Sequence, residues 1–176
     1  MDAQIQQLLE LSKLENEQMK PDLRLISIHM IFEALMERFS REAAQKNVSL
    51  RFDASDTLQI LADEAMITRA VENFLTNALK HTQDAGEIRV SAGQENKVTR
   101  ISVYNSGARL SGEQLERIWD VFYTGESSAH TSGHGVGLAI VKSIAQLHGG
   151  SVFAENQECG VTFSLLLPRK DQPKNA

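Results

Sequence analysis

The sequence predicts an α+β fold, a two-layer α/β sandwich in which a mixed sheet is backed by about three helices. Two observations predict it. Pairs of short segments alternate apolar and polar residues as strands do, and longer segments with apolar residues at helical spacing separate these pairs. A length of 176 residues suits one domain built around one core.

The first segment, residues 1–20, places isoleucine and leucine among polar helix formers until Pro21 interrupts the pattern. We expect it to be the end of a helix or linker cut from a longer protein that covers its apolar face. A helix that caps the following domain is the alternative. Residues 21–170 form the predicted domain, and residues 171–176 a frayed tail.

The elements of the domain follow in order. Helical spacing predicts a helix over 28–46, and alternation predicts strands at 48–52 and 58–62 around a polar turn. Asp63 is placed to cap a long helix that ends near His81. The remaining expected elements are strands at 87–93 and 98–105, a short helix from a Ser111–Gln114 capping box through Trp119, a polar loop at 124–135, a helix from Val136 to Leu147, and a hairpin of 151–155 with 161–167.

The composition excludes several classes of function. The net charge of −5 and the pI near 5.5 offer nothing to attract a phosphate backbone, so no nucleic-acid partner is expected. No apolar run approaches the ~20 residues of a membrane span, and we expect no signal peptide. Cys159 is the only cysteine, which excludes an internal disulfide or a cysteine zinc cluster and fits a reducing, cytoplasmic setting.

A glycine-rich segment, TSGHGVGLAIVKSIAQLHGG at 131–150, is the first candidate site. Alternating glycines let backbone N–H groups converge on an anion at the N-terminus of the helix that follows. Gly133, Gly135 and Glu155 imitate a dinucleotide-binding fingerprint, but no buried strand precedes the loop and only two strands remain. A phosphate-binding P-loop is excluded because Gly-Lys-Ser/Thr is absent. A plain turn that needs glycine for its geometry stays the alternative.

Two other segments carry polar groups suited to a nucleotide. Beside the apolar stripe of the 63–81 helix, Asn73, Asn77 and Lys80 fall on one face at i, i+4 and i+7. Two amides and an ammonium suit a hard cation bound to phosphates, although a solvated helix flank has the same composition. The strand end at 105–107, Asn-Ser-Gly, presents a polar side chain and a flexible backbone that can read the edge of a flat ring.

In this order, these segments resemble the ATP-binding catalytic domain of bacterial sensor histidine kinases, within the superfamily that also includes gyrase, the heat-shock chaperone ATPase and mismatch-repair ATPases. The resemblance covers about residues 21–168. Its five segments are NFLTNALKHT (73–82), similar to the asparagine box; NSG (105–107), the first glycine box; VFY (121–123), the phenylalanine box; GHGVGLAIV (133–141), the second glycine box; and CGVTF (159–163), the glycine-threonine segment.

The resemblance implies a Bergerat (GHKL) fold that holds ATP and Mg²⁺ between the asparagine-box helix and a mobile lid. It implies that Asn77 coordinates magnesium, that Asn73 and Lys80 lie near the phosphates as the other catalytic residues, and that Asn105 faces the adenine amine. The other implied nucleotide contacts are His81, Gly107, Arg109, Phe122, Tyr123, Gly133, His134, Gly135, Val136, Gly137, Leu138 and Thr162, the last of them near the adenine.

One position separates a kinase from a hydrolytic ATPase. Hydrolytic members of the superfamily place a glutamate four residues before the magnesium asparagine to deprotonate water, and here that position is Asn73. Glu72 is adjacent, but one residue is about 100° around a helix, so its side chain should point elsewhere. We therefore expect a protein-histidine kinase, in which the γ-phosphate passes to a histidine; an ATPase is the weaker alternative.

Three features depart from the family pattern. None of the five histidines has the acidic neighbour and following proline of a phosphoacceptor, so this chain should bind ATP without phosphorylating itself. Asn105 and Arg109 replace the usual aspartate and glycine, which should weaken adenine binding. No lysine or arginine lies between Arg117 and Lys142, so the lid should close mainly through backbone amides.

The resemblance also implies partners: the dimerisation and phosphoacceptor domain of the same kinase, and a response regulator. LLELSKLE (8–15) resembles the end of the dimerisation helix. The full-length protein would be a membrane-anchored homodimer with this part in the cytoplasm, and the fragment itself would be monomeric. A non-catalytic or regulatory nucleotide-binding module of the same fold is the alternative function.

Overall fold

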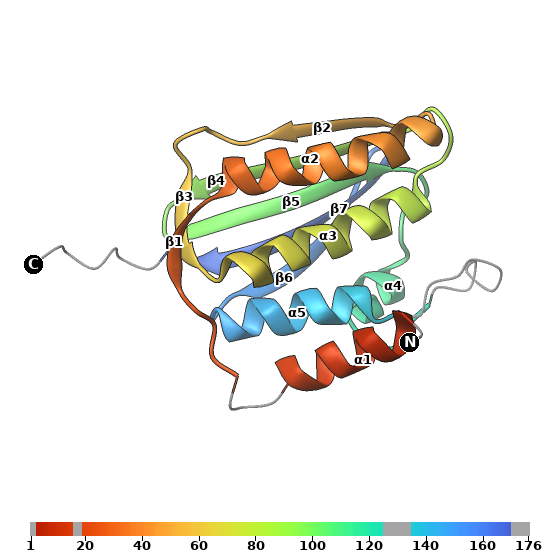
Figure 1. Ribbon diagram of the computed structural model, residues 1–176. Coiled ribbons are helices and arrows are strands. Elements are labelled where there is room, and N and C mark those ends of the chain that lie inside the picture. The colour runs from red at the N-terminus through yellow and green to blue at the C-terminus, as the bar shows by residue number, and fades with distance from the viewer. Residues whose placement is uncertain (1–2, 16–18, 125–134, 170–176) are drawn as a thin grey trace, which may run out of the picture.

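The computed structural model describes residues 3–15, 19–124 and 135–169 (Figure 1). Helices α2, α3 and α5 lie side by side across one face of the larger sheet (Figure 1). None of the described helices is both long and apolar enough to cross a membrane. The elements are α1 (Ala3–Leu14), β1 (Arg24–Ser27), α2 (Ile28–Gln45), β2 (Ser49–Asp53), β3 (Gln59–Ala62), α3 (Glu64–His81), β4 (Glu87–Glu95), β5 (Val98–Ser106), α4 (Gly112–Arg117), α5 (Gly137–Leu147), β6 (Ser151–Gln157) and β7 (Gly160–Pro168).

The larger sheet has the strand order β2-β4-β5-β7-β6. β2 pairs with β4 in parallel and every other neighbouring pair is antiparallel, so the sheet is mixed, as predicted. With the helix layer it forms the expected α+β sandwich. A separate two-stranded ribbon pairs β1 with β3. The sequence interpretation missed β1, because its four residues lead directly into α2 and are too few to show a period.

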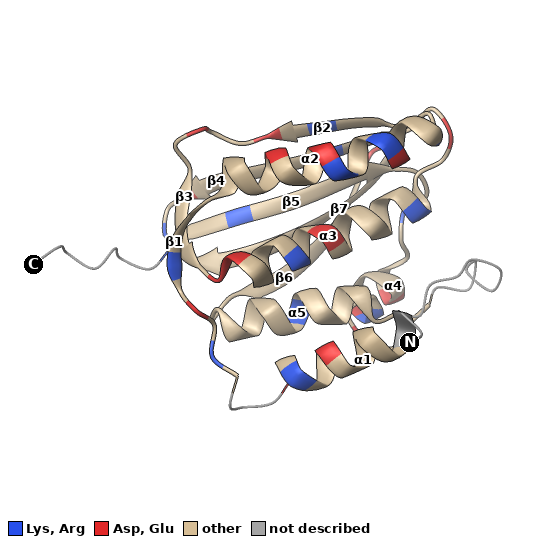
Figure 2. Cartoon of the chain, in the orientation of Figure 1, with Lys and Arg blue, Asp and Glu red and all other residues tan. Residues whose placement is uncertain are grey.

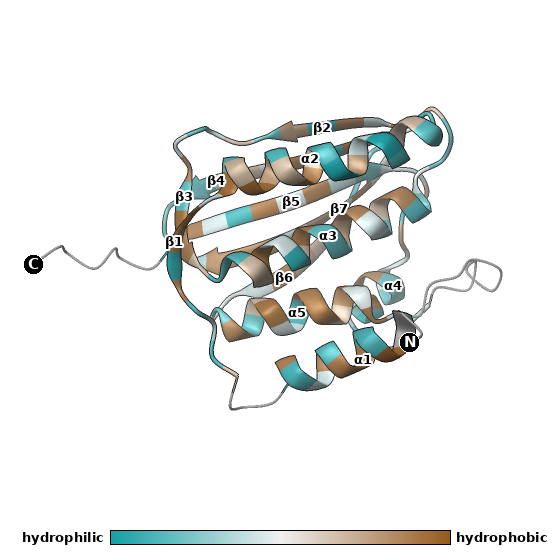
Figure 3. Ribbon diagram, in the orientation of Figure 1, coloured by the Kyte–Doolittle hydropathy of each residue, from teal (hydrophilic) through white to brown (hydrophobic). Residues whose placement is uncertain are grey.

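α3 forms where predicted because its cap and its apolar stripe agree. The Asp63 carboxylate accepts a hydrogen bond from the backbone N–H of Met66 at 3.1 Å. Phe74, in the middle of the stripe, is fully buried and packs its ring against Trp119 and Phe163, with centroid distances of 6.4 and 6.2 Å. Figure 3 shows apolar residues recurring along α3 and α5 and along the strands behind them. This shared core fixes the positions of both helices.

His148 joins α5 to the start of α3. The His148 ring is 3% exposed, and its Nε2 accepts a hydrogen bond from the backbone N–H of Asp63 at 3.1 Å. Its Nδ1 lies 2.8 Å from the carbonyl oxygen of Ile144, so the imidazole proton sits on Nδ1 and points at that oxygen. The N-cap residue of α3 is thereby bonded to the C-cap residue of α5.

α1 packs on the domain beside α5 (Figure 1). Leu11 and Leu14 are buried, and the Glu10 carboxylate forms a two-pronged ion pair with the Arg69 guanidinium of α3, with a shortest N–O distance of 2.7 Å. This packing matches the alternative expectation of a helix that caps the domain. Three apolar side chains of α1 remain exposed: Ile5, Leu8 and Leu9. The assignment of residues 1–20 to a dimerisation helix therefore stays a prediction.

Candidate nucleotide site

Three segments predicted to share a site meet at one end of the fold. Gly137 opens α5, and a Cβ built on it would lie 3.0 Å from Oδ1 of Asn73 in α3. Gly107 follows β5, and a Cβ built there would lie 3.1 Å from the carbonyl oxygen of His81. The asparagine box (73–82) therefore lies next to both the first glycine box (105–107) and the described part of the second glycine box (135–141).

Asn73 is turned toward the first turn of α5. Its side chain is 6% exposed, and its Nδ2 donates to the carbonyl oxygen of Arg69 at 2.9 Å, which leaves Oδ1 facing Gly137. The N-terminus of a helix presents unpaired N–H groups and a partial positive charge. Asn73 is therefore held at the end of α5 that is suited to an anion.

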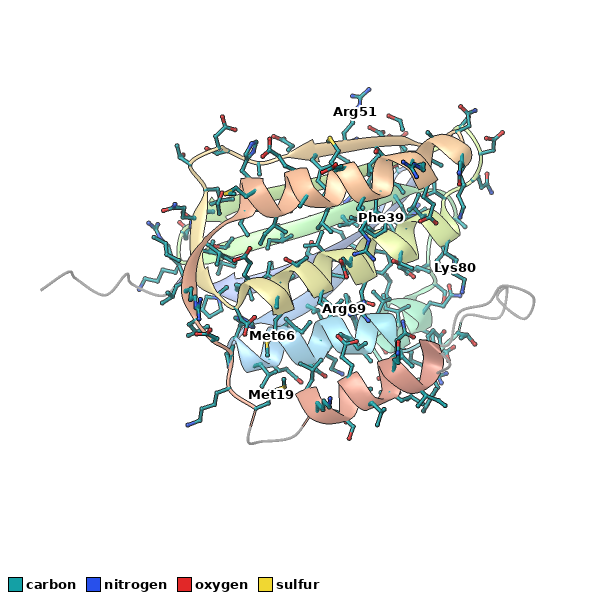
Figure 4. The ribbon with its side chains drawn as sticks, viewed as in Figure 1. Met19, Phe39, Arg51, Met66, Arg69 and Lys80 are labelled. Atoms are coloured by element: carbon teal, nitrogen blue, oxygen red, sulfur yellow. The ribbon has the colours of Figure 1, made fainter. Side chains whose placement is uncertain are left out.

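Asn77 and Lys80 continue the same flank of α3 toward its C-terminal end, where Figure 4 shows Lys80. Both residues are half-buried, and within the described residues neither side chain forms a hydrogen bond or an ion pair. No cluster of three histidine, cysteine, aspartate or glutamate side chains that could hold a metal occurs there either. The amide oxygen of Asn77 is the kind of ligand that a magnesium ion would accept beside phosphates and water.

His81 ends α3 next to Lys80. Partial desolvation of the ring lowers the pKa of His81 below its ordinary value of 6.5, and the positive charge of Lys80 lowers it further. The ring is consequently neutral at pH 7. An uncharged imidazole can accept or donate one hydrogen bond beside a nucleotide without adding charge.

Asn105 lies on the helix-covered face of β5 and is 4% exposed. Its Nδ2 donates to the carbonyl oxygen of Ser106 at 3.3 Å, and within the described residues its Oδ1 accepts no hydrogen bond. That oxygen is the group that an adenine amine would approach. Arg109, two residues beyond Gly107, is exposed.

The prediction that Thr162 lies near the adenine is corrected by the strand register. Asn105 pairs with Val161 across the β5–β7 ladder, whereas Thr162 pairs with Tyr104. Paired residues share a face and successive residues alternate, so Thr162 points to the opposite face of the sheet from Asn105. Val161, 2% exposed, is the side chain beside Asn105. The alternating apolar residues of VTFSLLLP could have revealed this, because Val161 is in phase with buried Phe163.

The phenylalanine box is bonded to the second glycine box. The backbone N–H of Phe122 donates to the carbonyl oxygen of Gly135 at 2.9 Å. Gly135 has a φ of 65°, and a Cβ there would lie 2.5 Å from the carbonyl oxygen of Tyr123, so both conformation and space require glycine. Phe122 also has a φ of 65° and is 63% exposed, an unusual state for a bulky residue.

The other predicted residues of this region have mixed placements. The Tyr123 ring is covered by the Arg117 guanidinium at 4.7 Å from its centroid. Val136 is buried and Leu138 is half-buried at the start of α5. Gly133 and His134 lie outside the described residues.

Glu72 points away from the site, as its helical position predicted. Its carboxylate pairs with Arg38 of α2 and lies 3.5 Å from the Arg69 guanidinium, and its side chain is 15% exposed. Arg69 also forms an ion pair with Glu10, so the chain of charged residues extends across three helices. The hydrogen bond from Arg69 to Glu10 raises the pKa of Arg69, although burial acts in the opposite direction. Figure 2 shows acidic and basic residues on α1, α2 and α3, with α5 lying between α3 and α1. Glu72 is thus committed to structural ion pairs and is not placed to deprotonate water at Asn77.

The chain belongs to the family of histidine kinase-, DNA gyrase B- and HSP90-like ATPases, which it matches over residues 62–171. Within that family it corresponds to the catalytic ATP-binding domain of sensor histidine kinases. It is 31% identical over 170 residues to the sensor histidine kinase CusS of Escherichia coli O6:H1, covering 96% of this chain and 35% of CusS. The chain thus spans about a third of that relative.

Solved structures of histidine kinases share its fold. The catalytic domain of histidine kinase ThkA is 27% identical with a TM-score of 0.77, covering 84% of this chain and 96% of ThkA's domain. Full-length ShkA in complex with AMPPNP is 26% identical with a TM-score of 0.83, covering 94% of this chain and 35% of ShkA.

Proposed function

We propose that this chain binds ATP with Mg²⁺ between α3, β5 and α5 and transfers the γ-phosphate to a histidine of a dimerisation domain, for relay to a response regulator. The approach of Asn73 to Gly137 supports this most directly, because it sets the amide flank of α3 beside the N-terminus of α5. The AMPPNP complex of the similar protein ShkA supports the nucleotide.

The residues of this chain would act by positioning and by neutralising charge. Magnesium, when bound, would stabilise the negative charge that develops on the transferred group. Asn77 would hold the ion, Lys80 would contact the phosphates, and the first-turn amides of α5 would receive the anion. Asn73 supplies no base for water and Glu72 is occupied by arginines, which preserves the γ-phosphate for a protein acceptor.

Calorimetric titration of the chain with AMPPNP, in the presence and absence of Mg²⁺, tests the site. We expect saturable binding that Asn77→Ala weakens by at least about tenfold, equivalent to about 1.4 kcal/mol. Thr76→Ala is the matched control, because Thr76 is the exposed neighbour of Asn77 and should leave the affinity unchanged. Absence of binding at millimolar AMPPNP would contradict the proposal.

A non-catalytic nucleotide-binding module is the second candidate, favoured by one observation. Asn105 offers the adenine amine a neutral acceptor in place of a carboxylate, which makes for a weaker hydrogen bond. Mixing the chain with its dimerisation domain and radiolabelled ATP separates the two functions. Acid-labile phosphohistidine on the partner supports the kinase; nucleotide binding without phosphotransfer supports the module.

The setting of the chain is also a proposal. Exposed Ile5, Leu8 and Leu9 on α1 suit the end of a dimerisation helix. The resemblance to sensor histidine kinases implies a membrane-anchored homodimer whose catalytic part is cytoplasmic. The fragment alone should be monomeric. Sedimentation velocity of this chain, with and without an N-terminal extension carrying the upstream helix, tests this: dimers should form only with the extension.

A further inference from the structure

A cleft lies at the far end of the fold from the nucleotide site. Its volume is about 850 Å³, and its walls are the β1–β3 ribbon, the turn between β4 and β5, and the end of β7. His148 also lines it and bonds to Asp63 at the start of α3, whereas the candidate nucleotide site lies along the C-terminal half of that helix. The proposed function uses none of these walls.

One wall of the cleft contains the free edge of β3, an edge that pairs with no strand in the described part of the chain. The backbone N–H of Ile28 donates to the carbonyl oxygen of Leu58, which marks the hydrogen-bonded phase of the β1–β3 pairing. In an antiparallel pair this phase alternates, so the backbone groups of Gln59 and Leu61 point away from β1. Gln59 confirms the direction: its carbonyl oxygen accepts a bond from the Gln94 side chain across the cleft at 3.4 Å, near the limit for a hydrogen bond.

The same ribbon offers apolar side chains. Leu25 and Leu61 are directly paired across β1 and β3, and both line the cleft. Leu25 is 47% exposed, although the next residue, Ile26, is buried in the core. A strand that follows β3 could cover this pair with alternate side chains while its backbone bonds to Gln59 and Leu61.

The charge of the cleft has one sign. Lys97 and Arg169 line it, and none of the aspartates and glutamates that the structure describes does. The backbone N–H of Arg169 donates to the carbonyl oxygen of Lys97 at 2.7 Å, which fixes both residues at one rim. Within the described residues neither cation has an ion-pair partner. A cleft lined by one sign of charge raises the local concentration of the opposite sign, here an anion.

We propose that this cleft binds an extended acidic segment of a partner protein as an added strand on the free edge of β3. The free edge supplies backbone hydrogen bonds, Leu25 and Leu61 supply apolar contact, and Lys97 and Arg169 select acidic side chains. Such a partner would bind without competing for the nucleotide site. This proposal stands on the cleft alone and does not depend on ATP binding.

The probe is a short capped peptide that alternates glutamate with valine, titrated into the ¹⁵N-labelled chain. We expect saturable shifts of amide resonances in β3, in the β4–β5 turn and at Arg169, and no such shifts with the peptide that alternates lysine with valine. Methylation of alternate peptide nitrogens should weaken binding by at least about tenfold, because it removes the strand hydrogen bonds and keeps the charge.

The protein variants test charge at the cleft. Lys97→Glu with Arg169→Glu should weaken peptide binding by at least about tenfold. Arg41→Glu with Arg51→Glu is the matched control, since both arginines are exposed outside the cleft and the charge change is identical. The proposal is overturned if the acidic peptide does not bind, if the N-methylated peptide binds equally well, if both double variants weaken binding alike, or if inorganic phosphate alone produces the same shifts.

Discussion

Adding a methyl group at residue 137 should disturb the contact on which the candidate site depends. In Gly137→Ala the new Cβ would stand 3.0 Å from Oδ1 and 3.7 Å from Cγ of Asn73, the first of which is closer than ordinary contact. Asn73 cannot simply withdraw, because its Nδ2 is bonded to the carbonyl oxygen of Arg69. Overpacking destabilises a protein by about 1–3 kcal/mol, and the higher helix propensity of alanine offsets up to about 1 kcal/mol of that loss. We expect a net loss of about 1–2 kcal/mol in the free energy of unfolding.

A double-mutant cycle measured by urea unfolding isolates this contact. Asn73→Ala removes the obstructing amide, so Gly137→Ala added to that background should cost nothing and should stabilise α5 by up to about 1 kcal/mol. The two substitutions should therefore show a coupling of about 1–3 kcal/mol, which is the cost of overpacking itself. An equal cost of Gly137→Ala in both backgrounds would refute the reasoning, because the penalty would then arise somewhere other than at Asn73.

Three further outcomes are expected. Phe122→Asn should raise the free energy of unfolding by about 1 kcal/mol, because asparagine tolerates the left-handed backbone at φ 65° and the exposed ring of Phe122 buries little surface. An unchanged or lower free energy of unfolding in chemical denaturation would contradict this. Glu10→Gln should lower the free energy of unfolding by only about 0.5–1 kcal/mol, because the ion pair with Arg69 is about one-third exposed, but it should speed amide hydrogen exchange throughout α1. The control Glu15→Gln, at an exposed residue, should change neither the stability nor the exchange. Because the pKa of His81 is lowered in the folded chain, the unfolded chain binds the proton more readily. The stability should therefore be fully present above about pH 6.5 and fall as the pH drops below that value. His81→Asn should flatten this part of the plot of stability against pH, and an unaltered slope would contradict the assignment.

Local signals in the sequence were sufficient for the elements that build the site. α3 could be predicted because Asp63 caps it and a broad apolar stripe runs along it. Ser111 and Gln114 likewise form the expected capping box, although α4 ends at Arg117 and Trp119 lies beyond it. The direction of Glu72 followed from helix geometry alone, and its ion pairs with Arg38 and Arg69 agree with that expectation.

Long-range pairing decided what could not be predicted. The face presented by Thr162 depends on its register with Tyr104, and a shift of one residue reverses every side chain of a strand. β1 forms because Ile26 pairs with Ile60, and α2 and β2 lie between these two residues in the sequence. The four residues of β1 carry no local pattern that predicts this pairing. The surface on which α1 packs is likewise distant in the sequence: it consists mainly of α5, with Arg69 of α3 bonded to Glu10, and no local pattern describes it.

The antiparallel helices α3 and α5 are constrained near both ends of their contact. A hydrogen bond joins Asp63 to His148 at one end, and at the other Gly137 lies so close to Asn73 that an added Cβ would stand 3.0 Å from its Oδ1. A change in the crossing angle of the two helices would have to break the hydrogen bond between Asp63 and His148 or alter the close approach of Gly137 to Asn73. His148 also lines the distant cleft, so any displacement of α5 relative to α3 would change a wall of that cleft.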